Sequence, residues 1–237
     1  MPTATGPSDT KPGTPPSFKN ATRVQVSFVT AAEKRALAWF AAHMPAWVGS
    51  DDLTILGFAA QIMVGVSYAL SRYDRSWLLW GVLFLVINWF GDSLDGTVAR
   101  FRNRQRPRYG FYVDHVIDAV GSTILMTGLA LSGYMTPLIA MALLIGFLLL
   151  SVEVYLATYT IGSFHLSFFN FGPTEIRIIF ALGNIVLYVR GPWARIAGHT
   201  FLVFDVGAVI ALPVLCVMFL YAAIKHIAQL YREERLP

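Results

Sequence analysis

Charged residues are scarce in this chain of 237 residues: Asp, Glu, Lys and Arg make up 14%, whereas 56% of the residues are hydrophobic. A soluble domain has about 25% charged residues. The shortage excludes an ordinary soluble protein and predicts an all-α, polytopic membrane protein. The net charge of +4 does not indicate a nucleic-acid partner, because most basic residues flank apolar runs, where they orient a protein among membrane lipids.

Cysteine is nearly absent. The single Cys216 excludes an internal disulfide framework, and its place in an apolar run predicts a buried thiol. The chain also lacks an internal repeat of the kind found in inverted-repeat transporters. Residues 1–25 are rich in Pro, Thr, Ser and Gly and contain no apolar run, so they are predicted to be a disordered cytoplasmic tail rather than a signal peptide.

Residues 26–52 are predicted to form an interfacial amphipathic helix and a linker. Within residues 31–44, Leu37, Phe40 and Met44 recur at helical spacing, and charged residues take the other side. This pattern favours a helix that lies along the membrane surface.

Residues 53–232 are predicted to be a domain of six transmembrane helices, each near the 20 residues that cross about 30 Å of hydrocarbon, followed by a cytoplasmic tail at 233–237. We expect Gly110 to break the chain before the third helix and Pro173 to open the fifth. The six expected spans are residues 53–71, 77–102, 111–133, 136–161, 174–190 and 201–230.

The distribution of basic residues predicts the orientation of these spans. With the N-terminus inside, 14 of the 18 Lys and Arg residues fall on the inner side. Only Arg72, Arg75, Arg190 and Arg195 fall on the outer side. The positive-inside rule therefore favours cytoplasmic N- and C-termini.

Four aspartates lie near the ends of the second and third spans. Asp92 and Asp95 share one face of the second span, and Asp114 and Asp118 share one face of the third. Asp92 lies about 15 Å above the end of its span and Asp118 about 12 Å above Gly110, so the two pairs are expected to meet at one depth. A carboxylate within a membrane is costly and usually serves an ion, a substrate or a proton. A single aspartate often does no more than pair with a neighbouring helix, but such packing does not explain all four.

Carboxylates gathered in one pocket repel each other unless they share protons or bind cations. Oxygen ligands without His or Cys at ligand spacing indicate Mg²⁺ or Mn²⁺, with two ions expected and Ca²⁺ as a further candidate. Small residues at Gly96, Ala99 and Gly110 leave room for a phosphate ester, and Arg100 offers a guanidinium. The set suits a metal-bound pyrophosphate that is attacked in line by an alcohol, with one carboxylate left to take the alcohol proton.

The aspartate region resembles the signature of the CDP-alcohol phosphotransferase family at all eight positions. That signature reads D-x-x-D-G-x-x-A-R, then, after nine residues in this chain, G-x-x-x-D-x-x-x-D. The resemblance implies transfer of a substituted phosphate from a CDP-linked donor to an alcohol or lipid acceptor, release of CMP, a homodimer and an active site facing the cytoplasm. It implies metal ligands at Asp92, Asp95, Asp114 and Asp118, with Asp118 as the general base. It implies a CDP site made by Asp92, Asp95, Gly96, Ala99, Arg100 and Gly110.

The fourth and fifth spans indicate the subclass. The fourth span has Glu153 and no arginine, and Gly172-Pro173-Thr174-Glu175 is similar to a stretch of choline and ethanolamine phosphotransferases. We therefore favour an aminoalcohol phosphotransferase that uses diacylglycerol, with Glu153 and Glu175 near a cationic head group. The alternative is a phosphatidyltransferase that uses CDP-diacylglycerol and a polar alcohol.

Two of these residues have simpler explanations. Glu175 is either a head-group ligand or an acid that suits a helix N-terminus. Arg177 is either a clamp for a substrate phosphate or a positive-inside anchor. A divalent-cation transporter, a function of another class, would explain the aspartates but not the glycines, Ala99 and Arg100.

Overall fold

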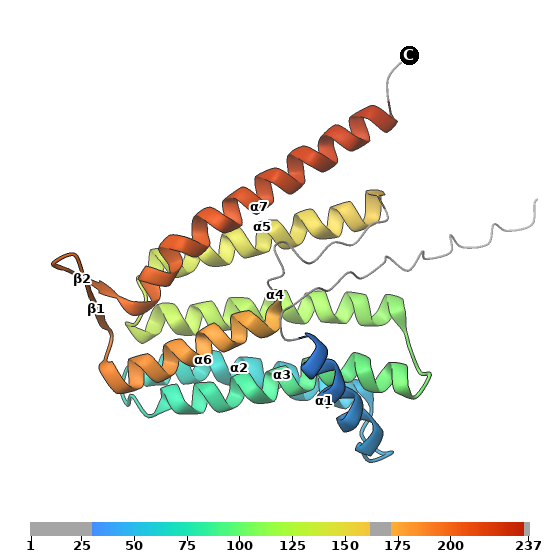
Figure 1. The fold of residues 1–237 in the computed structure, drawn as a ribbon, viewed down its shortest axis with the longest axis horizontal. Helices are drawn as coiled ribbons and strands as arrows, with labels where there is room; N and C mark the ends of the chain where they lie inside the picture. The colour runs from blue at the N-terminus through green and yellow to red at the C-terminus, as the bar shows by residue number, and fades with distance from the viewer. Residues whose placement is uncertain (1–29, 162–171, 235–237) are drawn as a thin grey trace, which may run out of the picture.

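The computed structural model describes residues 30–161 and 172–234, which form seven helices and one two-stranded hairpin (Figure 1). The predicted tails fall almost entirely outside these residues. The elements are α1 (Thr30–His43), α2 (Ser50–Ser71), α3 (Trp77–Phe101), α4 (Pro107–Ser132), α5 (Pro137–Ile161), α6 (Pro173–Arg190), β1 (Trp193–Ile196), β2 (His199–Leu202) and α7 (Val203–Glu233).

Five of the helices are long and apolar enough to cross a membrane: α2, α3, α4, α5 and α7. These five confirm five of the six expected spans. The remaining segment forms α6, whose 18 residues include Glu175, Arg177 and Arg190 and therefore carry too much charge to qualify by composition. Whether α6 crosses the bilayer stays a prediction.

The predicted N-terminal helix exists as α1, and one side of it packs on the bundle. Leu37 and Ala41 are buried in a cluster with Leu53 of α2 and with Leu94 and Val98 of α3. Its placement at the membrane surface remains a prediction.

Two details of the expected helices are wrong. Gly110 does not break the chain: α4 begins at Pro107, and the Gly110 amide donates to the Arg106 carbonyl at 2.8 Å. Proline suits the first turn of a helix, where its missing N–H costs nothing, so the helix begins earlier than the glycine indicated. Cys216 is exposed on α7, of whose apolar window only 11% is buried.

The chain before α7 forms a hairpin that was not predicted. Trp193 pairs with Leu202, and Ile196 pairs with His199, which leaves a two-residue turn. Both turn residues have positive φ, 50° at Ala197 and 84° at Gly198, as a type I′ turn requires. The sixth span therefore begins at Val203 instead of residue 201.

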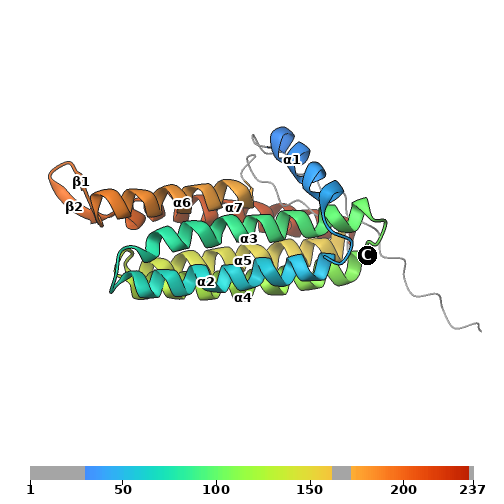
Figure 2. The same ribbon diagram turned by 90° about the horizontal axis from the view of Figure 1, so that it is seen from below.

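Helix α2 lies between α3 and α4 and touches both along its length (Figure 2). A Cβ atom at Gly91 of α3 would lie 2.6 Å from the backbone nitrogen of Gly57, and one at Gly128 of α4 would lie 2.0 Å from the carbonyl oxygen of Gly65. Glycine thus allows backbone-to-backbone contact on two sides of α2.

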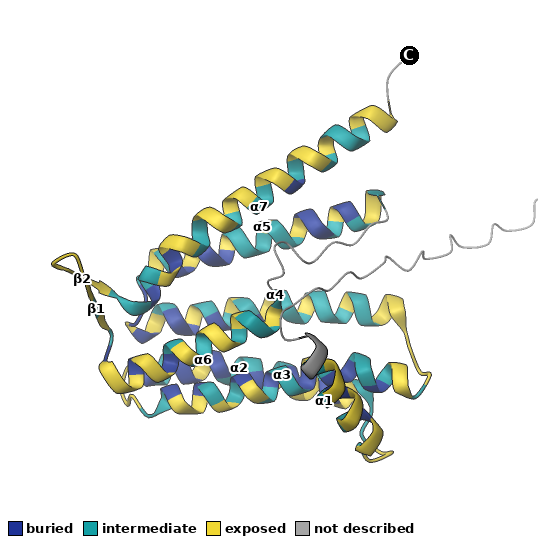
Figure 3. Ribbon diagram, in the orientation of Figure 1, coloured by how far each residue is buried: buried dark blue, intermediate teal, exposed yellow. Residues whose placement is uncertain are grey.

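Helices α5 and α7 pack against each other, and α4 joins them to the rest of the bundle. Asp205 of α7 accepts hydrogen bonds from the Thr136 amide and hydroxyl, at 2.8 Å and 2.6 Å, and so caps the start of α5. Much of α7 is exposed (Figure 3), including Val209, Ile210 and Val217. Together with the other long helices, this apolar surface indicates an integral membrane protein.

Candidate active site

All four aspartates line one pocket between α2, α3 and α4. The predicted convergence of the second and third spans is therefore confirmed. Helix α2, which contributes no aspartate, forms the third wall. The pocket is lined by Thr54, Gly57, Phe58, Gln61, Asn88, Asp92, Asp95, Asp114, Ile117 and Asp118.

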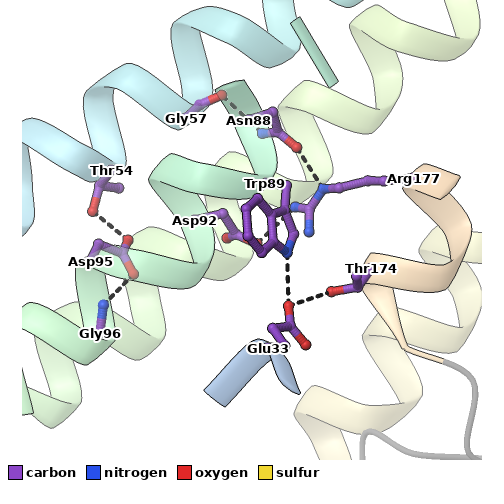
Figure 4. A network of polar contacts seen from close by, with 10 residues as sticks. All are labelled: Glu33, Thr54, Gly57, Asn88, Trp89, Asp92, Asp95, Gly96, Thr174 and Arg177. Carbon is purple, nitrogen blue, oxygen red and sulfur yellow. Dashed lines mark hydrogen bonds and ion pairs between the residues drawn. The ribbon is translucent and has the colours of Figure 1, made fainter. Parts of the chain in front are cut away.

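Asp95 is the most deeply placed of the four, with 9% of its surface exposed. Its carboxylate accepts a hydrogen bond from the Thr54 hydroxyl of α2 at 2.7 Å and another from the Gly96 amide (Figure 4). These contacts hold one carboxylate oxygen against α2. Sequence spacing does not reveal Thr54, because it lies 41 residues from Asp95.

Asp92 is more open, with 41% of its side chain exposed, and it forms an ion pair with Arg177 of α6 at 2.7 Å. The Arg177 Nε donates to the Asn88 side-chain oxygen at 2.7 Å, and the Asn88 amide donates to the Gly57 carbonyl at 2.9 Å. This chain of contacts brings α6 to the aspartates, which a mere positive-inside anchor would not require. A role for Arg177 in holding a substrate phosphate stays a prediction.

The two glutamates proposed for a head group are not among the residues that line the pocket. Glu153 of α5 is buried, and its Oε1 lies 2.5 Å from the Nδ1 of His226 on α7. Glu175 accepts the Gly172 amide at 2.9 Å, which caps the start of α6 as the simpler explanation of this residue expects.

The other signature residues lie on the same helices but outside the pocket lining. A Cβ atom at Gly96 would lie 3.3 Å from the Arg100 guanidinium, so Arg100 lies over the glycine. Arg100 also donates to the Thr97 hydroxyl at 3.1 Å. Space is open around Gly110, and Ala99 is partly exposed. Their part in binding a CDP group stays a prediction.

The oxygen donors at the pocket have the chemistry that a divalent cation needs. As the described side chains lie, however, no three His, Cys, Asp or Glu residues are close enough to hold one ion. Asp92 points to Arg177 and Asp95 to Thr54. The donor set fits a metal, but Asp92 must turn from Arg177 toward the other aspartates to share one with them.

Comparisons with known proteins identify the family. The CDP-alcohol phosphatidyltransferase family matches residues 47–217, a stretch that holds every residue of the pocket. A phosphatidylinositol phosphate synthase of Streptomyces avermitilis is 34% identical over 98 residues, which are 41% of this chain and 38% of that protein. Another of the same name, from Cutibacterium acnes, is 31% identical over 90 residues, 38% of this chain and 41% of that protein. The matched stretches thus span about two fifths of these relatives, whereas the family match covers most of the chain. The chain belongs to the CDP-alcohol phosphatidyltransferase family.

Proposed function

We propose that this protein transfers a phosphatidyl group from CDP-diacylglycerol to the hydroxyl of a polar alcohol and releases CMP. The observation that carries the proposal is the single pocket lined by Asp92, Asp95, Asp114 and Asp118. In the transfer, the alcohol oxygen bonds to the phosphorus that bears diacylglycerol, and the bond from that phosphorus to the CMP oxygen breaks.

The choice of donor differs from the aminoalcohol subclass favoured on sequence alone. Both relatives reported above are named for a phosphatidyl product, which supports the CDP-diacylglycerol alternative. The residues that suggested a cationic head group also have other partners, since Glu153 bonds His226 and Glu175 caps α6. No acidic side chain beyond the four aspartates lines the described pocket.

We assign Asp92, Asp95 and Asp114 to divalent metal ions, and Asp118 to a metal ion and to the alcohol proton. Bound Mg²⁺ or Mn²⁺ would neutralise the charge on the pyrophosphate. Thr54 fixes Asp95, so this carboxylate needs little reorganisation when it acts. Asp118 takes the proton as the alcohol oxygen attacks, which keeps the nucleophile reactive at neutral pH.

The same proposal includes the setting of the site. The N- and C-termini and the pocket face the cytoplasm, as the distribution of basic residues favours. The protein acts as a homodimer, as the family resemblance implies, and Gly96, Ala99, Arg100 and Gly110 surround the CDP group.

Purified protein with Mg²⁺, CDP-diacylglycerol and a panel of polar alcohols, both free and phosphorylated, tests this function through CMP release. We expect CMP with CDP-diacylglycerol and one acceptor, and none with CDP-choline or CDP-ethanolamine plus diacylglycerol. The reverse pattern would restore the aminoalcohol subclass. Absence of CMP throughout, together with Mg²⁺ flux into proteoliposomes, would indicate a transporter.

A further inference from the structure

Glu33 of α1 connects two helices that hold the pocket's ion pair. Its Oε1 accepts a hydrogen bond from the Trp89 indole N–H of α3 at 2.7 Å and another from the Thr174 hydroxyl of α6 at 2.9 Å (Figure 4). One oxygen atom therefore joins α1, α3 and α6.

Both donors lie one helical turn from the ion pair. Trp89 precedes Asp92 by three residues on α3, and Thr174 precedes Arg177 by three on α6. The Glu33 oxygen therefore sets the separation of the two turns from which Asp92 and Arg177 reach each other at 2.7 Å.

Buried apolar packing is sparse at this end of α6. The buried residues of α6 are Asn184 and Leu187, both in its second half, whereas no residue from Pro173 to Gly183 is buried. Phe180 and Ala181 pack against the core cluster only from the third turn onward, so the first two turns, which carry Thr174 and Arg177, depend mainly on polar contacts.

Helix α1, in contrast, is well anchored. Leu37 and Ala41 are buried against α2 and α3. The Arg102 guanidinium at the end of α3 donates to the carbonyls of Met44, Pro45 and Val48, at 3.0, 2.9 and 2.5 Å, and so holds the linker after α1. The Glu33 carboxylate is thus held in a fixed position from which it can orient α6.

We propose that Glu33 is a positioning residue for the transfer reaction: it holds the start of α6 so that Arg177 lies at Asp92. The expected effects on kinetics rest on the function proposed above, whereas the positioning of α6 by Glu33 does not depend on that function. Both donors are neutral and use one oxygen, so the site requires an acceptor atom rather than a negative charge.

Kinetics with three variants show whether residue 33 must supply an acceptor oxygen or a negative charge. Glu33→Ala removes the acceptor and is expected to lower kcat/KM by about tenfold, the lower range for residues that orient ligands of a metal site. Glu33→Gln keeps the oxygen and should retain most of the activity. Lys34→Ala, an exposed change on the same helix, is the matched control. Equal losses in Glu33→Gln and Glu33→Ala would show that charge matters and would overturn the proposal.

A double-mutant cycle with Arg177→Ala distinguishes positioning from general stability. If Glu33 acts through Arg177, Glu33→Ala should cost nothing further in the Arg177→Ala background. Additive losses would mean an independent structural role and would contradict the inference. Trp89→Phe and Thr174→Val each remove one donor, and they replace Glu33→Ala in the cycle if that variant does not fold.

A distance measurement needs no reaction at all. In a Cys216→Ser background, spin labels at Arg35 and Ile178, both exposed, report the separation of α1 and the first half of α6. We expect one narrow distribution for the parent and for Glu33→Gln, and a broader one for Glu33→Ala. An unchanged distribution would refute the positioning role. A broadened one in a protein that releases no CMP would leave the positioning role intact and count against the proposed function alone.

Discussion

The four aspartates of the pocket occupy unequal surroundings. Asp95 is 9% exposed and bonded to Thr54, whereas 41% of the Asp92 side chain is exposed and its partner is Arg177. Side chains of one chemical type take different roles when their surroundings differ in this way. Asp95 is therefore the fixed member of the set, and Asp92 is the one that must exchange its partner to bind a cation.

Asp118→Asn tests the assignment of the general base. We expect turnover to fall by at least about a hundredfold, because general-base catalysis contributes roughly 10²–10⁴, while binding of the CDP-linked donor survives. CMP release and equilibrium donor binding measure the two effects. Asp74→Asn, in the turn before α3, is the control and should change neither. Full turnover in Asp118→Asn would remove this residue from proton transfer.

Asp92→Asn tests the metal assignment. The amide is a poorer cation ligand and no longer forms a salt bridge with Arg177, so the Mg²⁺ concentration for half-maximal CMP release should rise, by about tenfold or more. Chelation of divalent ions should abolish activity in the parent, and added Mg²⁺ or Mn²⁺ should restore it. An unchanged Mg²⁺ dependence in Asp92→Asn would mean that this carboxylate binds no essential ion.

At the scale of single residues, the sequence predicted the aspartates but not the side chains that hold them in position. Spacings of three and four residues place carboxylates on one helix face, so the aspartate pairs were readable from the chain itself. Thr54 and Glu33 meet their partners across 41 to 141 residues of sequence, and no spacing rule relates such positions. Arg177 was recognised, but its contact with Asp92 depends on how α6 packs on α3.

Among the elements, α2 packs against both α3 and α4 although it contributes no aspartate to the pocket. Gly57 and Gly65 lie about two turns apart on it and face Gly91 of α3 and Gly128 of α4. Close approach of three backbones brings α3 and α4 to neighbouring faces of α2 and lets their carboxylates meet in one pocket. Such interfaces were missed because an apolar run does not reveal which glycine faces a neighbour.

Gly128→Ala should therefore destabilise the bundle. The added carbon would lie 2.0 Å from the Gly65 carbonyl oxygen, so α2 and α4 must separate. Overpacking of this kind costs about 1–3 kcal/mol. Gly207→Ala is a matched control on α7, since no atom lies within 4 Å of its added carbon. Thermal unfolding in detergent should show a lower midpoint only for Gly128→Ala, and equal midpoints would mean that the α2–α4 contact is looser than described.

For the whole molecule, the number of membrane crossings depends on α6, because the other five long helices all qualify as spans. The 18 residues of α6 span about 27 Å, slightly less than the hydrocarbon thickness of about 30 Å. Its charged residues lie near its two ends and are accommodated there: Glu175 caps the helix, Arg177 pairs with Asp92, and Arg190 lies in the last turn, where a long side chain can reach the interface. The hairpin that follows α6 lies at the same end of the bundle as the α2–α3 and α4–α5 turns in both views (Figures 1 and 2). This arrangement favours six crossings.

Cysteine accessibility decides between the two topologies. In a Cys216→Ser background, Thr200→Cys marks the hairpin and Gln105→Cys marks the α3–α4 loop, both exposed. With six spans an impermeant thiol reagent reaches residue 200 in intact cells and residue 105 only after lysis, because the two lie on opposite sides. With five spans α6 does not cross, so residues 200 and 105 share one side and label together. Tyr73→Cys, in the α2–α3 turn, is an internal reference because it lies on the outer side in both topologies. It should label like residue 200 with six spans and unlike residue 200 with five.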